Sequence, residues 1–535
     1  MGRTALRNML AGALLAAGLL AAPAAAAGVP GELRGRVTAD GKGVAGVRVT
    51  DGRTIVQTDR RGRYRLPADR EAAFVYLTLP DGFEIPARQG AATLYRRIEP
   101  GKVRDYDFAL RPAAREMTRH RLLVVADPQV YFEKELDSVR RAAADMRRTA
   151  ADSVETFGVV CGDIIGDITR RPLLFEAVRD ALARSGEPFF YAVGNHDMDV
   201  DARSNALSKQ SFEACFGPTC YSFDRGRIHY VVLDDVFFLA RGYLYAGYLG
   251  ERQLKWLEQD LAFVPHGSTV VVCFHIPTWS RAARQGEWGK EESNKVLNNR
   301  RALYALLAPY RAHIMSAHEH YNENYQPAEH IFEHVHAPLS TLFWQTPLSM
   351  DGIPAGYGVY EADGDTLTWY WKAVDYGRGR QFTAYAAGED PREPEAVTVN
   401  VWNYDPAWKV RWYENGVPQG EMERYTGYDA AMADYVERHR GEFVYKYIGA
   451  APTEHLFRAV PSAPGAEVCV EVEDRFGNRY LWSAAQGYSC RLAAEAQAPQ
   501  AAQSPKKETP KRELPKKESL KEPPQEGTAA PHAAE

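Results

Sequence analysis

Five short segments of the chain each place metal-binding side chains directly after a run of apolar residues. Runs such as Leu-Leu-Val-Val and Val-Val-Val-Cys are typical of buried β-strands in α/β proteins. In open α/β sheets, ligands bind at the carboxyl ends of the strands, where loops bring residues far apart in sequence to one point. Carboxylate oxygen, amide oxygen and imidazole nitrogen together suit ions such as Mn, Fe and Zn. The candidate ligands are Asp127, Gln129, Asp163, Asn195, His275, His318 and His320.

The order of these segments resembles a known family. The motifs are Asp-Pro-Gln at 127–129, Gly-Asp at 162–163, Gly-Asn-His-Asp at 194–197, a single His275 and Ala-His-Glu-His at 317–320. Over about residues 119 to 375 the chain is similar to the calcineurin-like metallophosphoesterases, whose pattern is D-x-H, G-D-x-x-D, G-N-H-[DE], a single His and G-H-x-H. It departs from that pattern at Gln129, where many members have His, and at Ala317, where many have Gly.

The resemblance implies two divalent metal ions and hydrolysis of a phosphate ester. Two such ions polarise the phosphoryl oxygens and lower the pKa of a bound water, so that a metal-bound hydroxide can attack phosphorus near neutral pH. Asp163 would bridge the two ions, since each carboxylate oxygen can serve one metal. The first ion would be completed by Asp127, His320 and Gln129, and the second by Asn195, His275 and His318.

The same resemblance implies catalytic roles within the Gly-Asn-His-Asp motif. His196 would not bind metal but would face the leaving group and protonate it as a general acid, a role that suits the pKa of histidine. Asp197 would hold the imidazole ring and raise its pKa, and Asn195 would help the metals to stabilise the transition state. Asp167 is expected to orient a loop by hydrogen bonding and not to bind metal.

The elements that must position these residues lie in the middle of the chain. Residues 119–375 alternate apolar strands with amphipathic helical segments, which fits the central α/β metallophosphoesterase domain of the family, a β-sandwich flanked by helices. Residues 28–112 and 385–492 instead show short alternating strands and Asp-Gly or Asn-Gly turns, which predict two small all-β sandwich domains. The first of these resembles the transthyretin-like modules found before exported hydrolase domains.

The two ends of the chain have compositions of their own. Residues 1–27 contain Arg3 and Arg7, an apolar run and an Ala-rich stretch, which predict a cleaved signal peptide and a periplasmic or secreted bacterial protein. Residues 493–535 are rich in Pro, Lys and Glu and contain no aromatic residue, which predicts a disordered tail. After the signal peptide, no segment is long and apolar enough to predict a membrane span.

Six cysteines fit an exported chain. Cys215 and Cys220 flank a turn-like Phe-Gly-Pro-Thr sequence, and Cys469 and Cys490 lie in the C-terminal β region. Each pair is a candidate disulfide. The remaining two cysteines lie within apolar strands and are interpreted as buried thiols.

Composition limits the classes of function. Of 535 residues, 45% are hydrophobic and 25% charged, as in ordinary globular proteins. The formal net charge of −5 shows no basic excess, so we expect no binding to nucleic-acid polymers, although a single nucleotide is possible as a substrate.

The leading hypothesis is an exported, metal-dependent phosphoesterase with two divalent ions, and the Asp-Pro-Gln form of the first motif slightly favours monoesters. One alternative is a phosphodiesterase that acts on a nucleotide, a lipid headgroup or an envelope polymer. A second is a degenerate, non-catalytic protein that binds the cell envelope through its β modules or tail, which Gln129 and Ala317 motivate.

Overall fold

A computed structural model describes residues 31–488 except 68, 70, 100–103, 167–172, 242 and 282–292. The predicted signal peptide, the predicted tail, Asp167 and Cys490 lie outside the described residues. Within them, no helix is both long and apolar enough to cross a membrane.

The N-terminal domain is a small sandwich of two sheets. One sheet contains β1 (Glu32–Ala39), β2 (Lys42–Gly43), β5 (Arg63–Pro67) and β10 (Phe108–Leu110), and the other contains β3 (Arg48–Thr50), β4 (Ile55–Gln57), β6 (Phe74–Leu77) and β9 (Tyr95–Arg97). Alternation along the strands turns Leu33, Val37 and Leu66 inward, where they are fully buried. The predicted β-sandwich is confirmed.

The N-terminal domain shares a sheet and a core with the central domain. Its short strands β7 (Ala87–Arg88) and β8 (Ala91–Ala92) extend the central sheet, since β8 pairs in parallel with β13 (Phe189–Ala192). Buried side chains of both domains form one continuous hydrophobic cluster. The N-terminal domain is therefore part of the scaffold of the central sheet.

A buried charge network strengthens this junction. Arg48 donates to Asp224 at 2.5 Å and to Asp260 at 3.3 Å. The ring of His229 lies between the same carboxylates, at 2.7 Å from Asp224 and 2.9 Å from Asp260. Burial lowers the pKa of His229, but the two carboxylates outweigh it and raise the pKa to about 9. The imidazolium and Arg48 together neutralise the buried Asp260 and the partly buried Asp224.

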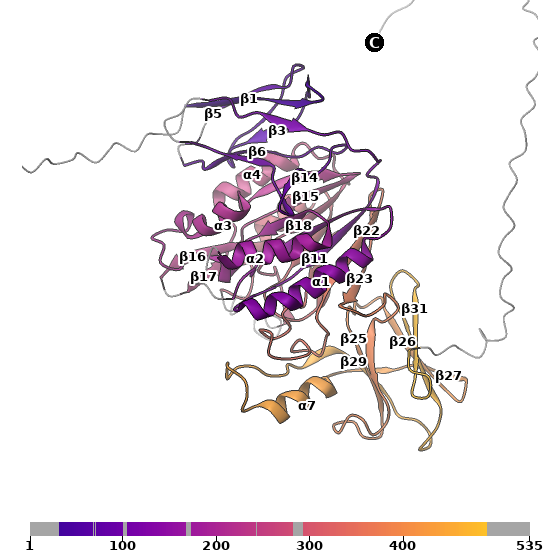
Figure 1. Ribbon diagram of the computed structural model, residues 1–535. Helices are drawn as coiled ribbons and strands as arrows, with labels where there is room; N and C mark the ends of the chain where they lie inside the picture. Colours follow the sequence, from indigo (N-terminus) through magenta and orange to yellow (C-terminus); the bar gives the residue numbers. More distant parts are fainter. Residues whose placement is uncertain are drawn as a thin grey trace, which may run out of the picture. The chain divides into compact units, whose positions relative to one another are not determined.

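Two mixed sheets, each with parallel strands at its centre, form the central domain and pack face to face (Figure 1). The first has the order β23-β22-β11-β12-β13-β8-β7 and the second the order β14-β15-β18-β19-β21-β20. The strands of the first are β11 (Arg119–Val125), β12 (Glu155–Cys161), β13, β22 (Gly356–Asp363) and β23 (Thr366–Ala373), besides β7 and β8. Those of the second are β14 (Tyr221–Arg225), β15 (Ile228–Val232), β18 (Thr269–Cys273), β19 (Arg311–Ser316), β20 (Glu323–Ala328) and β21 (Ile331–Val335). A separate hairpin joins β16 (Val236–Ala240) to β17 (Leu244–Gly247).

Helices cover the outer face of each sheet, which confirms the predicted α/β architecture. Figure 1 shows α1 (Leu136–Thr149) and α2 (Leu173–Leu182) side by side over the first sheet, and α3 (Gln210–Phe216) joins their buried cluster. The second sheet is covered by α4 (Glu251–Leu261) and α6 (Arg300–Leu307). Short 3-10 helices lie at Glu133–Glu135, Ala183–Ser185, Asn195–Asp197 and Ala206–Lys209.

The C-terminal domain is a second sandwich with one added helix, α7 (Ala430–His439). One sheet contains β24 (Phe382–Tyr385), β25 (Val397–Val401), β28 (Glu423–Gly427) and β29 (Thr453–Ala459). The other contains β26 (Lys409–Glu414), β27 (Val417–Glu421), β30 (Val468–Glu473) and β31 (Arg479–Ser483). Val399, Trp408 and Val470 are among the side chains that fill the space between them. The Asp429 carboxylate accepts from the Met432 N–H and caps α7.

The predicted disulfide between Cys215 and Cys220 is wrong in this structure, where both thiols are free. Cys215 packs against the hydrophobic cluster beneath α2 and α3, whereas Cys220 packs against the cluster beneath α4. The two side chains face different cores on either side of the turn. The predicted pairing of Cys469 stays a prediction, because its partner Cys490 lies outside the described residues.

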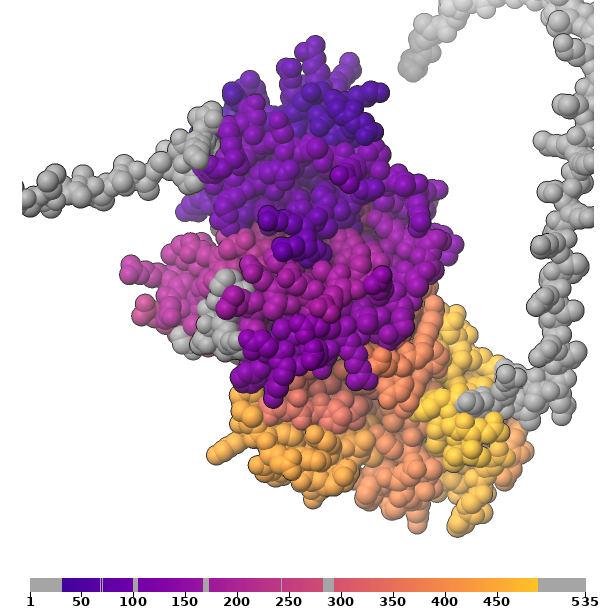
Figure 2. Space-filling view, viewed as in Figure 1, coloured from indigo at the N-terminus to yellow at the C-terminus, as the bar shows by residue number. Residues whose placement is uncertain are grey.

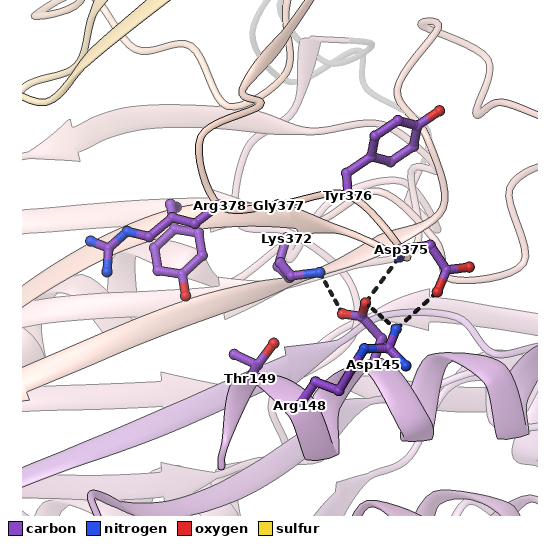
Figure 3. A pocket seen from close by; sticks show the side chains of 9 residues that line it. Asp145, Arg148, Thr149, Lys372, Asp375, Tyr376, Gly377 and Arg378 are labelled. Atoms are coloured by element: carbon purple, nitrogen blue, oxygen red, sulfur yellow. Dashed lines mark hydrogen bonds and ion pairs between the residues drawn. The ribbon is translucent and has the colours of Figure 1, made fainter. Parts of the chain in front are cut away.

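A buried carboxylate ties helix α1 to strand β23. Asp145 accepts from the Lys372 ammonium at 2.5 Å, the Tyr357 hydroxyl at 2.7 Å and the Asp375 N–H at 2.9 Å. Figure 3 shows Asp145 and Lys372 at the wall of a cavity of about 360 Å³. Burial raises the pKa of the Asp145 carboxyl, but these hydrogen bonds outweigh it and hold the pKa below its ordinary value of 3.8.

Replacing Asp145 by Asn should lower the free energy of unfolding by about 2–4 kcal/mol at pH 7, because Lys372 would keep a buried charge without its partner. Since the folded pKa is depressed, this stabilisation is present above pH 3.8 and is lost as the pH falls through the folded value. Urea unfolding at pH 7 and at pH 3 measures the difference between wild type and Asp145→Asn.

Asp137→Asn, an exposed position on the same helix, serves as the control and should change stability by no more than about 0.5 kcal/mol. A difference between wild type and Asp145→Asn that stays constant over this pH range would contradict the assigned role of the carboxylate.

Candidate metal centre

The predicted ligands come together at the carboxyl ends of the central strands, as expected. Asp127, Asp163, His275 and His318 each lie two residues beyond the end of β11, β12, β18 and β19, and Asn195 lies three beyond β13. The two packed sheets therefore both contribute. Ligand atoms of Asp163, His275 and His318 all lie within 4.8 Å of one another and are buried, so these three side chains could hold one ion.

The backbone at this site is strained. A non-glycine residue with positive φ is uncommon, and such strain clusters at functional sites at a cost of roughly 1–3 kcal/mol per residue. Five of the seven predicted ligands have a positive φ: Asp127 (42°), Gln129 (37°), Asp163 (50°), His318 (70°) and His320 (60°).

Two glycines allow the loops after β12 and β13 to touch. A Cβ atom on Gly194 would lie 2.0 Å from the backbone nitrogen of Asp163 and 2.3 Å from its Oδ1 atom. A Cβ atom on Gly162, whose φ is 85°, would lie 2.7 Å from Nδ1 of His275. This contact lets the His196 N–H donate to Asp163 Oδ1 at 2.8 Å. The backbones of the Gly-Asp and Gly-Asn-His-Asp motifs therefore pack directly against each other.

His275 is the centre of one half of the site. Its Nδ1 lies 2.8 Å from the Cys161 carbonyl oxygen, which turns Nε2 toward the cluster. Nε2 lies 2.9 Å from Asn195 Oδ1, 3.1 Å from His318 Nδ1 and 3.4 Å from Asp163 Oδ1. Burial lowers the pKa of His275, but Asp163 and other carboxylates outweigh it and raise the pKa to about 10. The carboxylates beside His275 thus supply the negative charge that a cation needs.

The other half of the site contains buried polar atoms without partners. Asp127 Oδ1, Gln129 Oε1 and His320 Nδ1 have no hydrogen-bond partner among the described residues. Gln129 Nε2 donates to Asp163 Oδ2 at 2.9 Å, which leaves its carbonyl oxygen for another partner. Unpaired buried acceptors are costly in a folded protein. The donor set therefore fits a bound divalent ion, and Gln129 retains the oxygen that would bind it.

His196 lies beside the ligand cluster and is not part of it. Its side chain is 22% exposed, whereas that of Asp163 is almost fully buried. Nδ1 lies 3.3 Å from the Gly166 carbonyl oxygen, and the ring makes an edge contact with Tyr243 at 5.1 Å between centroids. Nε2 lies 3.9 Å from Asp163 Oδ2. The imidazole is thus held at the margin of the site with one nitrogen toward it.

The predicted contact between Asp197 and the His196 ring is wrong in this structure. The Asp197 carboxylate accepts from the backbone N–H groups of Gly194 at 2.8 Å, Ile164 at 2.9 Å and Ile165 at 3.3 Å. None of the hydrogen bonds or ion pairs of the described residues joins it to His196. Asp197 ties the two glycine loops together, and the Gly166 carbonyl oxygen contacts the ring in its place.

Three residues near the site were not predicted from the sequence. Asp235 accepts from the backbone N–H groups of His275 at 3.2 Å and Ile276 at 2.9 Å, and so braces the loop after β18. Tyr243 places its hydroxyl 3.3 Å from Asn195 Nδ2, and Tyr245 makes an edge contact with His318. Asp235 follows the apolar strand β15 and was interpreted from the sequence as a loop residue, whereas the alternating Tyr243 and Tyr245 indicate a strand and not a site.

The departure at Ala317 does not disturb the loop after β19. Ala317 is fully buried and does not have the positive φ that would demand glycine. Its N–H donates to the His275 carbonyl oxygen at 2.9 Å, which joins the last two ligand loops. The extra methyl group is therefore accommodated.

Comparison with protein families agrees with this geometry. Three family models match the chain: the N terminal of Calcineurin-like phosphoesterase over 31–113, Calcineurin-like phosphoesterase over 120–322, and the C terminal of Calcineurin-like phosphoesterase over 333–480. Together they span most of the chain and define a metal-dependent phosphoric ester hydrolase. The protein belongs to the calcineurin-like phosphoesterase family, as its motifs predicted.

Similarity to individual proteins is weaker. A dimetal phosphatase from Danio rerio is 15% identical, with 48% of this chain and 96% of that chain covered and a TM-score of 0.36. The purple acid phosphatase PPD1 from yellow lupin (Lupinus luteus) seeds is 15% identical, with 48% and 52% covered and a TM-score of 0.33. A 5'-nucleotidase from Candida albicans is 10% identical, with 49% and 53% covered and a TM-score of 0.30. The chain matches no curated protein sequence. These similarities assign no substrate.

Gly194→Ala should prevent the site from assembling, because the added Cβ would force the loops after β12 and β13 apart. After dialysis against Mn, we expect wild type to hold about two ions per chain and the variant to hold clearly fewer. Inductively coupled plasma mass spectrometry measures the metal, and circular dichroism checks the fold.

Gly250→Ala is the matched control, since a Cβ atom there meets open space and φ is not positive. Full metal content in Gly194→Ala would show that the close approach of the two loops is dispensable.

Proposed function

We propose that this protein is an exported metallophosphoesterase that uses two divalent ions and acts preferentially on phosphate monoesters. The observation that supports it best is the convergence of the donor residues beside a partly exposed His196: three of them place ligand atoms within 4.8 Å of one another, and among the described residues others keep buried atoms without a hydrogen bond. Bound ions would supply positive charge that neutralises the phosphoryl oxygens and lowers the pKa of a water molecule. The residues that would hold them are Asp127, Gln129, Asp163, Asn195, His275, His318 and His320.

The remaining groups of the site position the substrate and move a proton. Asn195 has its amide nitrogen close to the Tyr243 hydroxyl and its oxygen close to His275, so its orientation is defined on both sides. His196 contacts the Gly166 carbonyl oxygen through Nδ1, which leaves Nε2 for a substrate oxygen. In its protonated form, Nε2–H can donate a proton to the departing oxygen. The leaving group is therefore expected on the His196 side of the site.

The preference for monoesters is supported by the Asp-Pro-Gln form of the first motif. Diester hydrolysis is the alternative outcome of the same assay, because one metal-binding core can serve either reaction. The retained donor atoms and the undisturbed loop at Ala317 weigh against a non-catalytic protein.

The deciding experiment measures turnover of an aryl monophosphate and a bis-aryl phosphate with Mn added, for wild type and for His196→Asn. We expect wild type to prefer the monophosphate. In the variant kcat should fall by about 10²–10⁴ because a general acid is lost, while the metal content stays unchanged.

The loss should be larger for an alkyl ester, whose leaving oxygen needs the proton more than an acidic phenol does. His330→Ala, at an exposed histidine outside the predicted site residues, should leave kcat unchanged. If wild type prefers the bis-aryl ester, the diesterase is favoured. An unchanged kcat in His196→Asn would refute the role of His196 as the acid. If wild type binds no metal and hydrolyses neither ester, a binding protein is favoured.

Export is the other part of the proposal, and the composition of residues 1–27 supports it. When the chain is expressed in a Gram-negative host, the protein should appear in the osmotic-shock fluid with an N-terminus near residue 28. Full-length protein that stays in the cytoplasm would contradict export.

A further inference from the structure

Five aromatic side chains form a continuous surface beside the metal centre, here called the aromatic wall. Tyr131 lies 6.0 Å from Tyr445 and 6.3 Å from Phe343 between ring centroids. Phe343 lies 5.6 Å from Tyr445 and 5.7 Å from Tyr447, and the two tyrosines stack at 5.4 Å with their planes 12° apart. Phe132 adjoins Tyr131 at 6.5 Å. Such distances are those of interacting aromatic pairs.

Three separate parts of the chain supply this wall. Tyr131 and Phe132 follow the Asp-Pro-Gln motif, Phe343 lies in the loop between β21 and β22, and Tyr445 and Tyr447 lie in the C-terminal domain between α7 and β29. Figure 2 shows the C-terminal segments, orange to yellow, packed against the central domain. The C-terminal domain thus brings two rings to the wall.

The loop that carries Phe343 is strained and fastened to the first metal-binding motif. Thr341, Phe343 and Trp344 all have positive φ, at 53°, 54° and 60°. The Trp344 indole N–H donates to the Pro128 carbonyl oxygen at 2.9 Å. Strained backbone of this kind is retained at ligand clamps, where the surroundings hold it in place.

The wall borders the metal centre on the side of His196. The Phe343 ring lies 4.9 Å from the ring of His320. The Tyr131 ring packs on Gly166 so closely that a Cβ atom there would lie 2.2 Å from it, and the Gly166 carbonyl oxygen contacts His196 Nδ1. One end of the wall is therefore connected through Gly166 to His196, the residue that would protonate the leaving group.

The outer rings of the wall are exposed although the inner rings are packed. Tyr447 is 69% exposed and Phe132 is 53% exposed, whereas Phe343 and Tyr445 pack against a small buried cluster that includes Met432. Core packing accounts for the inner rings but gives no reason for two large exposed rings beside a polar site. Exposed aromatic surface at a polar rim is typical of ligand binding.

We propose that the aromatic wall binds the leaving group of the substrate, and that this leaving group carries a planar ring, as an aryl or nucleoside monophosphate does. The inference rests on the proposed function, because His196 defines the leaving-group side. Aromatic faces bind planar rings by stacking and discriminate little between them. The shared chemistry is therefore the flat π-face and not a particular base.

The test compares phenyl phosphate with glycerol 3-phosphate, which has an aliphatic leaving group, in wild type, Tyr447→Ala and Phe132→Ala. We expect the ratio of kcat/KM for phenyl over glyceryl ester to fall about threefold to tenfold in each variant, mainly through KM for the phenyl ester. Metal content should not change. Phe263→Ala, an exposed aromatic residue next to Arg48 of the N-terminal domain, is the control and should leave the ratio unchanged.

Calorimetry with phenylphosphonate and methylphosphonate, in the presence of Mn, separates this inference from the proposed function. Wild type should bind phenylphosphonate more tightly than methylphosphonate, and Tyr447→Ala should remove the difference. If wild type shows that preference but hydrolyses neither ester, the proposed function is wrong, and the inference that the aromatic wall binds a planar ring is supported. If both variants keep the wild-type ratio and the wild-type preference, the wall does not bind the leaving group.

Discussion

The metal centre depends on the contact between two backbone segments, residues 162–163 and 194–196. Gly194 leaves no room for a side chain against Asp163, and the His196 N–H then donates to the same carboxylate. This contact sets Asp163 between both halves of the site and places His196 beside it. A single methyl group at Gly194 would displace a ligand and the proposed acid together.

Carboxylates at this site serve two different purposes. Asp127 and Asp163 each accept one backbone N–H and lie beside a histidine of the cluster, whereas, among the described residues, Asp197 and Asp235 accept only backbone N–H groups of the loops that carry the ligands. Burial raises the pKa of Asp197 and of Asp235 to about 7. The loops bear strained residues at several ligands, and these side-chain anchors help to hold that strain in place.

The flanking domains take part in this arrangement. The N-terminal domain extends the sheet that ends in Asp127, Asp163 and Asn195. The C-terminal domain accepts a hydrogen bond at 3.0 Å from Asn322, just after the last ligand motif, through the Trp402 carbonyl oxygen. The C-terminal domain also supplies two rings of the aromatic wall. Both β-domains are therefore part of the framework that shapes the site.

The sequence alone predicted the fold class, the strand ends and seven candidate ligands, because apolar periodicity, the residues that follow each strand and the family motifs are local properties of the chain. The partners of Asp197, the brace by Asp235, the separation of Cys215 from Cys220 and the aromatic wall were decided only by tertiary structure. Each of these depends on which of several nearby groups a side chain meets after packing. A contact between residues more than a hundred positions apart, such as Tyr131 and Tyr445, cannot be recognised from the sequence.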